Sequence, residues 1–211
     1  YKEIITDGVW AYQRDNYGYR NLRSFPLMVD FQGLPYIDTR ISFNSFLPKA
    51  LSPELGDKLT NYYLQQLQQH PEFHDKVEFE IAFTCYTFDL PQRICVLEQH
   101  GFTQEERDSL VQTLRTLTNS ILGKDGLWKK DARKIEVLRD KHQTILDSNL
   151  EISEKIYWLL EYCKRYGTLP FAGLARAGFI AVELLRSMVS VGLLSEEERR
   201  CYMGDLSTVG K

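Results

Sequence analysis

The amino-acid sequence predicts a mainly α-helical protein of the α+β class, with about seven helices and one β-hairpin. Most apolar residues recur at helical spacing, and several of these runs follow good helix-capping residues. One stretch, 26–47, is instead rich in β-branched and aromatic residues around a Gln-Gly pair. Strands and helices do not alternate as a parallel βαβ sheet would require.

The chain opens with an expected helix over residues 1–14. An apolar stripe at helical spacing predicts it, made of Ile4, Ile5, Val9 and Trp10. The sequence Tyr17-Gly18-Tyr19 then ends this helix, because glycine interrupts helical structure at low cost.

The expected hairpin has arms at 26–31 and 36–43, joined by a turn at Gln32-Gly33. Side chains alternate between the two faces of a strand. One face of the second arm therefore carries the better core candidates, which are Ile37, Thr39, Ile41 and Phe43.

The next helix is expected to begin at Ser52-Pro53, a capping residue followed by proline in the first turn, and to end at Pro71. Residues 76–88 are predicted to form one further strand. Apolar residues alternate there at positions 77, 79, 81, 83 and 85. A short apolar run of this kind is also compatible with a helix.

The rest of the chain is predicted to be helical, at 89–101, 103–121, 128–145, 152–163, 170–191 and from 195 onward. Thr103 and Glu106 form a capping box at the start of one of these helices. The longest apolar stretch, 171–194, is interrupted by Arg176, Glu183 and Arg186. We therefore expect a buried helix there rather than a membrane span.

A length of 211 residues fits one domain, 1–211, in which 20–50 could form a small hairpin subdomain. The chain starts with Tyr1 rather than Met, so we expect an internal piece of a larger protein. The formal net charge of −3 argues against nucleic-acid binding, which favours a basic surface.

The four cysteines contain no CxxC pair, which argues against a zinc or redox motif. We expect reduced thiols in a cytoplasmic protein. Three of them are expected to pack as small apolar side chains, namely Cys85, Cys95 and Cys163.

Sequence motifs for catalysis are absent. The chain contains no GxxxxGK[ST], GxGxxG, HExxH or GxSxG pattern. His70 and His74 have the spacing of helical metal ligands, but Pro71 disturbs the helix between them and no further ligand is evident. No catalytic residue, metal ligand or cofactor is therefore assigned to this chain.

A first candidate anion site comprises Arg20, Arg23, Arg40 and Asn44 at the hairpin. Arginine binds carboxylate and phosphate oxygens through two parallel hydrogen bonds. If the arms pair, the start of the first arm comes near the end of the second, which would gather these groups for a small anionic ligand. The alternative is that Asp30 and Asp38 pair with the arginines.

A second candidate site comprises Lys164, Arg165 and Arg176 around a Gly-Thr-Leu-Pro turn. That turn is expected to begin a helix, whose free N–H groups would attract anions. The alternative is a tightly packed central helix, because small residues recur every four positions at Gly173, Ala177 and Ala181.

Four runs of the sequence resemble the central region of bacterial proteins of the phosphoenolpyruvate synthase or pyruvate phosphate dikinase-like group. These runs are NYGYRNLRSFP at 16–26, DTRISFNSFLP at 38–48, DKVEFE at 75–80 and YGTLPFAGLARAG at 166–178. The resemblance covers nearly the whole chain. It does not include the motifs of the group's known chemistry.

The resemblance implies a parent phosphotransferase that uses ATP and Mg²⁺. In that group a nucleotide-binding domain phosphorylates a histidine on a swivelling domain. Neither His100 nor the other histidines of this chain has the Gly/Thr/Ser-rich surroundings of that histidine. We therefore expect a non-catalytic middle domain whose partners are the neighbouring nucleotide-binding and phosphohistidine domains. The alternative is a substrate- or protein-interaction module unrelated to phosphotransfer.

The isolated chain is predicted to have no ATPase or phosphotransfer activity, because it has no phosphate loop and no phosphohistidine loop. Incubation of the purified chain with labelled ATP or phosphoenolpyruvate tests this. Label that becomes covalently attached to the chain would contradict the prediction.

Overall fold

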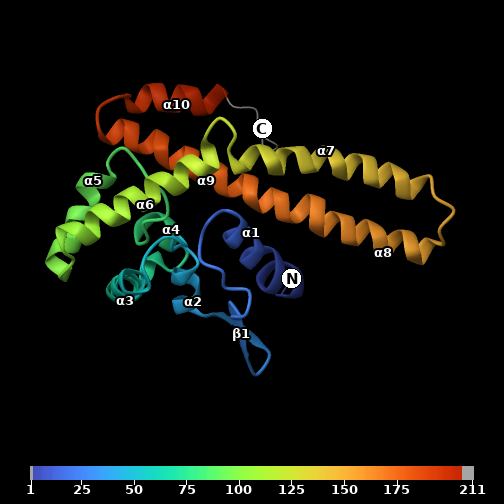
Figure 1. Ribbon diagram of the computed structural model, residues 1–211, viewed down its shortest axis with the longest axis horizontal. Coiled ribbons are helices and arrows are strands. Elements are labelled where there is room, and N and C mark those ends of the chain that lie inside the picture. Colours follow the sequence, from blue (N-terminus) through green and yellow to red (C-terminus); the bar gives the residue numbers. More distant parts are fainter. Residues whose placement is uncertain (1, 206–211) are drawn as a thin grey trace.

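A computed structural model describes residues 2–205, without the side chains at positions 2–4 and 7, and shows a predominantly helical α+β fold (Figure 1). The hairpin strands are β1 (Met28–Phe31) and β2 (Leu34–Ile37). The helices of the first half are η1 (Lys2–Trp10), α1 (Ala11–Asn16), α2 (Thr39–Asn44), α3 (Pro53–Gln69), η2 (Pro71–Phe73), α4 (Val77–Glu80), α5 (Leu90–Arg93) and η3 (Ile94–His100). Those of the second half are α6 (Gln104–Leu122), α7 (Leu127–Leu146), α8 (Ile152–Tyr162), η4 (Cys163–Thr168), α9 (Leu169–Ser190) and α10 (Glu196–Asp205).

The helices form a compact lobe and a long arm (Figure 1). Helices α2 to α6 gather in the lobe, with the β-hairpin projecting from its edge. Helix α8 continues through η4 into α9, so that one helix runs from Ile152 to Ser190. Helix α7 lies beside this helix, and α10 folds back against the end of α9.

The N-terminal helix is confirmed, since η1 and α1 together cover residues 2–16. Its first part, η1, is a π-helix, and Gly18 follows the end of α1 with a positive φ of 87°. The side chains of Ile5, Val9 and Trp10 are half-buried, whereas that of Ile4 lies outside the described side chains. The predicted stop at Tyr17-Gly18-Tyr19 is therefore correct.

The hairpin is confirmed, but its second arm is shorter than predicted. Gln32 and Gly33 both have positive φ, as a tight two-residue turn requires, and Phe31 pairs with Leu34. The second strand ends at Ile37, because the carboxylate of Asp38 accepts a hydrogen bond from the Ile41 N–H and caps helix α2. The predicted core face of this arm is therefore wrong. Phe43 is buried, but as part of helix α2, and Ile37 is 48% exposed.

The strand predicted at 76–88 is wrong. Residues 77–80 form helix α4, and residues 81–85 are all buried rather than alternately buried. Side chains, not a partner strand, bond the backbone here: the N–H groups of Phe83, Tyr86 and Phe88 donate to side-chain oxygens at 2.8–3.1 Å. The acceptors are Tyr63 Oη, Thr118 Oγ1 and Ser187 Oγ. These hydrogen bonds satisfy three donors that a buried irregular segment would otherwise leave unpaired.

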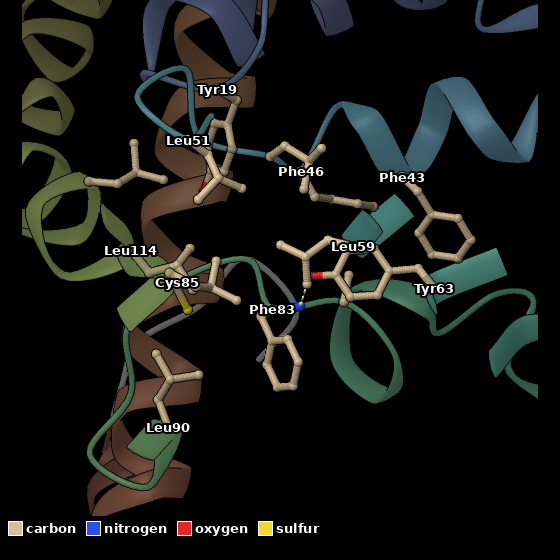
Figure 2. Close-up of a cluster of buried hydrophobic side chains, with 14 of the residues drawn as sticks. Tyr19, Phe43, Phe46, Leu51, Leu59, Tyr63, Phe83, Cys85, Leu90 and Leu114 are labelled. Carbon is tan, nitrogen blue, oxygen red and sulfur yellow. Dashed lines mark hydrogen bonds between the residues drawn. The ribbon is translucent and has the colours of Figure 1, made fainter. Parts of the chain in front are cut away.

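The core of the lobe is rich in aromatic residues (Figure 2). Helices α2 and α3 contribute Phe43 and Tyr63, whose ring centroids lie 5.5 Å apart. Helix α6 contributes a stripe at the predicted spacing, and α9 reaches the same core through Ala177 and Ile180. The stripe comprises Leu110, Leu114, Leu117 and Ile121.

The predicted helix starts in the lobe are confirmed. Ser52 accepts a hydrogen bond from the Leu55 N–H and caps α3. Thr103 and Glu106 form the expected reciprocal capping box of α6. These caps satisfy N–H groups that a helix leaves unpaired in its first turn.

The apolar helix at 170–191 is buried along one face only. Gly173, Ala177 and Ile180 are buried, whereas Phe171 is 68% exposed and Ala181 is also exposed. The continuous helix from 152 to 190 is long and apolar enough to cross a membrane, and 22% of its apolar window is buried within the protein. The expectation of a buried helix therefore holds for only one face of this segment.

The cysteines also differ from expectation. Cys85 is buried as predicted, but Cys95 and Cys163 are exposed. Both lie on helices whose apolar residues only partly face the core. A run of apolar neighbours does not show which face a given residue occupies.

Cys85 is predicted to resist thiol reagents in the folded protein, because burial raises the pKa of its thiol to about 12 and removes the reactive thiolate. The exposed thiols of Cys95, Cys163 and Cys201 should react promptly at neutral pH. Counting reacted thiols before and after denaturation tests this. Prompt native-state reaction of Cys85, identified by mass spectrometry, would contradict the burial of this residue.

Gly173→Ala is predicted to destabilise the fold by about 1–3 kcal/mol, because a Cβ there would overlap Asp131 Oδ2 and Tyr17 Oη. The Tyr17 hydroxyl donates to Asp131 at 2.8 Å, so both atoms are held in place. Gly178 lies on the same helix with open space around its Cα, which makes Gly178→Ala the matched control.

The control should stabilise the protein by about 0.5–1 kcal/mol through helix propensity. Urea unfolding of both variants measures the difference. Equal midpoints for the two variants would show that α9 does not approach Tyr17 closely at Gly173.

Candidate functional site

A buried polar network joins the long helix to the lobe. Arg176 of α9 is 3% exposed, and its Nε donates to Tyr19 Oη at 2.8 Å. Its second nitrogen donates to the Thr84 carbonyl at 2.9 Å, and its third forms an ion pair with Glu78. The Arg176 guanidinium was predicted to bind an anion, but all three of its nitrogens bond to other groups of the protein.

A second arginine lies beside this network. Arg14 is 3.9 Å from the carboxylate of Glu78, which therefore faces two guanidinium groups. Burial, followed by the charge of Arg176, lowers the pKa of Arg14 to about 9. The Arg14 guanidinium also lies over the ring of Phe46, with 4.7 Å to its centroid. The network thus contains two guanidinium groups beside one carboxylate.

The network fixes the backbone that carries Arg20. Tyr19 is completely buried, and burial raises the pKa of its hydroxyl, which donates to the Thr84 carbonyl at 2.9 Å. Tyr19 also forms an isolated antiparallel bridge with Pro48. The Arg20 N–H donates to the Leu47 carbonyl at 2.8 Å. The Arg20 side chain is thereby directed towards helices α2 and α3.

The start of this segment, helix α2 and the residues around the start of α3 line a cavity of about 720 Å³ that is open to solvent. We call it the Arg20–Arg40 cavity. It is lined by Arg20, Asn21, Leu22, Phe25, Arg40, Ile41, Asn44, Lys49, Leu51 and Pro53. Three of the four residues predicted for the first anion site meet here, namely Arg20, Arg40 and Asn44.

Both arginines of the cavity are held by neutral amides. Arg20 donates from Nη1 to Asn44 Oδ1 at 2.7 Å, and Arg40 donates from Nη1 to Asn61 Oδ1 at 3.0 Å. Asn44 is itself oriented by a 2.9 Å hydrogen bond from its amide nitrogen to the Arg40 carbonyl. An amide positions a guanidinium without cancelling its charge.

Among the described side chains, the acid paired with these arginines is Asp57, whose carboxylate is 3.7 Å from Arg20 and whose side chain is 76% exposed. An ion pair this exposed contributes little free energy. The two acids proposed as competitors have other roles: Asp30 accepts from the Gly33 N–H and Asp38 from the Ile41 N–H. The cavity therefore keeps a local excess of positive charge.

Arg23 does not join the cavity. It forms an ion pair with Asp15 and lies over the ring of Tyr12, with 4.1 Å to the ring centroid. Lys49, which does line the cavity, shares the same Asp15 carboxylate. Arg23 is thus close to the site in sequence but is engaged elsewhere.

Sequence reasoning missed the contribution of helix α3. The Arg20 guanidinium lies directly over Gly56, where any Cβ would overlap it. Asn61 of the same helix holds Arg40. A glycine inside a helix, where alanine is favoured, was the available signal for a close approach of another group. No comparable feature of the sequence indicated that Lys49 and Phe25 line the cavity.

The second predicted site does not assemble as expected. Lys164 and Arg165 both pair with Glu161, and the hydrogen bond from Lys164 lowers the pKa of this carboxylate. They line a separate cavity of about 550 Å³ with residues of η1 and Leu169. Arg176 is not among its lining residues.

The helix start predicted near Pro170 does not exist. The π-helical turn η4 joins α8 to α9 without a break, so the N–H groups there are not free. Proline cannot donate to the preceding turn, and a wider π turn accommodates the missing hydrogen bond. The anion-binding argument from a helix N-terminus therefore fails here.

His70 and His74 lie on either side of the short helix η2, beyond the end of α3 at Gln69. The ring of His70 contacts Glu72, whereas that of His74 contacts the Pro71 carbonyl. Among the side chains that the structure describes, no group of three or more His, Cys, Asp or Glu residues is arranged to hold a metal ion.

Comparison with protein-family models, curated proteins and solved structures finds no match for this chain.

Proposed function

We propose that this chain is a non-catalytic domain that binds an anionic ligand in the Arg20–Arg40 cavity. The observation that carries the proposal is the pair of guanidinium groups lining one cavity, each hydrogen-bonded to a neutral amide. Arginine binds phosphate and carboxylate groups through charge-assisted hydrogen bonds. No nucleophile with an adjacent base lines the cavity, which supports binding rather than catalysis.

We further propose that the domain is the middle part of a cytoplasmic phosphoenolpyruvate synthase-like phosphotransferase, where it covers neighbouring domains or binds the acceptor. The support is that the four runs carrying the resemblance meet in space. Two of them supply Arg20, Arg40 and Asn44 to the cavity, and the other two supply Glu78 and Arg176 to the buried network. ATP and Mg²⁺ would then belong to the neighbouring domains.

A protein-interaction module unrelated to phosphotransfer is a second candidate. Helix α8 favours it, because Ile152, Ile156 and Leu160 lie on one side of the arm and are 77%, 54% and 59% exposed. A row of exposed apolar side chains is typical of surfaces that contact other proteins. Anion binding at the cavity would be compatible both with a phosphotransferase domain and with an unrelated interaction module.

Arg40→Ala is predicted to weaken binding of phosphate or phosphoenolpyruvate by about tenfold or more, the effect of losing one charge-assisted hydrogen bond. Isothermal titration of the purified chain with phosphate, sulfate and phosphoenolpyruvate measures this. Arg23→Ala removes the same charge near the cavity but outside it, and should leave the affinity nearly unchanged.

Gly56→Ala offers an independent test, because the new methyl group would displace the Arg20 guanidinium without removing its charge. It should weaken binding in the same direction as Arg40→Ala. Negligible binding by the wild-type chain, or equal losses in the Arg40 and Arg23 variants, would reject the cavity as an anion site.

A further inference from the structure

We propose that the ligand of the Arg20–Arg40 cavity is an organic anion, in which a phosphate monoester or carboxylate is attached to an apolar, preferably planar, body. This inference rests on the anion binding proposed above. It goes beyond that proposal by assigning the apolar group of the ligand as well as its anionic group. Three features of the cavity support it: its size, its lining by both cationic and apolar residues, and the position of Phe25.

The cavity is larger than an inorganic ion requires. Its volume of about 720 Å³ is within the range of pockets that hold organic ligands, roughly 300–1,000 Å³. A phosphate or sulfate ion bound between the two arginines would fill a small part of this space. The rest would hold water against apolar walls, which is unfavourable compared with an apolar ligand group.

Both cationic and apolar residues line the cavity. Its cationic groups are Arg20, Arg40 on helix α2 and Lys49. Its apolar residues are Leu22 and Phe25 of the loop before β1, Ile41 of α2, and Leu51 and Pro53 at the start of α3. An inorganic anion uses only the cationic groups, whereas an organic anion also contacts the apolar residues.

Phe25 supplies a ring that no other described ring or cation covers. Its side chain is 53% exposed, and the side chains that the structure describes form no aromatic or cation–π contact with it. Its backbone is held by a 3.0 Å hydrogen bond from the Phe25 N–H to the Leu22 carbonyl, and Leu22 is itself buried. An exposed ring beside two arginines suits a ligand with a planar apolar group next to its charge.

The test compares four probes by isothermal titration with the whole chain: inorganic phosphate, glycerol phosphate, phenyl phosphate and benzoate. Phenyl phosphate or benzoate should bind about tenfold or more tightly than inorganic phosphate and glycerol phosphate. The difference between phenyl phosphate and benzoate identifies which anionic group the arginines prefer.

Phe25→Ala should abolish the preference for the phenyl-bearing probe while leaving the affinity for inorganic phosphate within about twofold. Phe31→Ala is the matched control, because Phe31 is also an exposed phenylalanine, at 63%, on the hairpin and outside the cavity. The control should keep the preference. Arg40→Ala should weaken every probe that binds.

The outcomes separate this inference from the proposed function. Phosphate binding that depends on Arg40 but shows no gain from a phenyl group, or a gain insensitive to Phe25→Ala, overturns the inference and leaves anion binding intact. Binding of no probe at all overturns both. Tight binding of phenyl phosphate that is unaffected by Arg40→Ala also overturns both, because the ligand would then sit elsewhere.

Discussion

The buried ion pair between Arg176 and Glu78 is the interaction on which the rest of this fold depends. It connects the long helix α9 to helix α4, and the same guanidinium holds Tyr19 and the carbonyl of Thr84. Removing Glu78 would leave the guanidinium groups of Arg176 and Arg14 without their shared acid, and loss of one partner of a buried pair typically costs about 3–5 kcal/mol. Three distant segments of the chain are therefore fixed relative to one another by one side chain. This arrangement also explains why the irregular segment after α4 can be buried (Figure 2).

The candidate site follows from this anchor. Because Tyr19 is held by Arg176, the next residue leaves the core at a defined place, and Arg20 reaches across to Asn44 on α2. Helix α3 supplies the opposite support through Gly56 and Asn61. A guanidinium placed in this way does not have to be reorganised when an anion binds, and that pre-organisation favours affinity. The site is thus a consequence of packing in the lobe, although its charged residues lie at the surface.

The sequence was sufficient to predict those features that depend on local chemistry. Helix starts at Ser52 and Thr103 follow from their own side chains, and the turn at Gln32-Gly33 follows from backbone freedom. Of the four residues predicted to meet, Arg20, Arg40 and Asn44 line one cavity and Arg23 does not, and Arg40 and Asn44 lie one turn apart on a helix and not on a strand. Some failures are local: the Asp38 cap that ends the second arm of the hairpin and the π turn that removes a helix start at Pro170. The others involve partners distant in sequence, namely the hydroxyls that bond residues 81–88 and the carboxylate that recruits Arg176. Periodicity alone contains no information about such partners.

The decisive experiment is a crystal structure of the chain grown with phenyl phosphate. We expect one bound molecule whose phosphate oxygens lie within hydrogen-bond distance of the guanidinium groups of Arg20 and Arg40, with its ring against Phe25. Density for the ligand beside Lys164 and Arg165, or an empty Arg20–Arg40 cavity in crystals that hold the ligand elsewhere, would show that this cavity is not the ligand site.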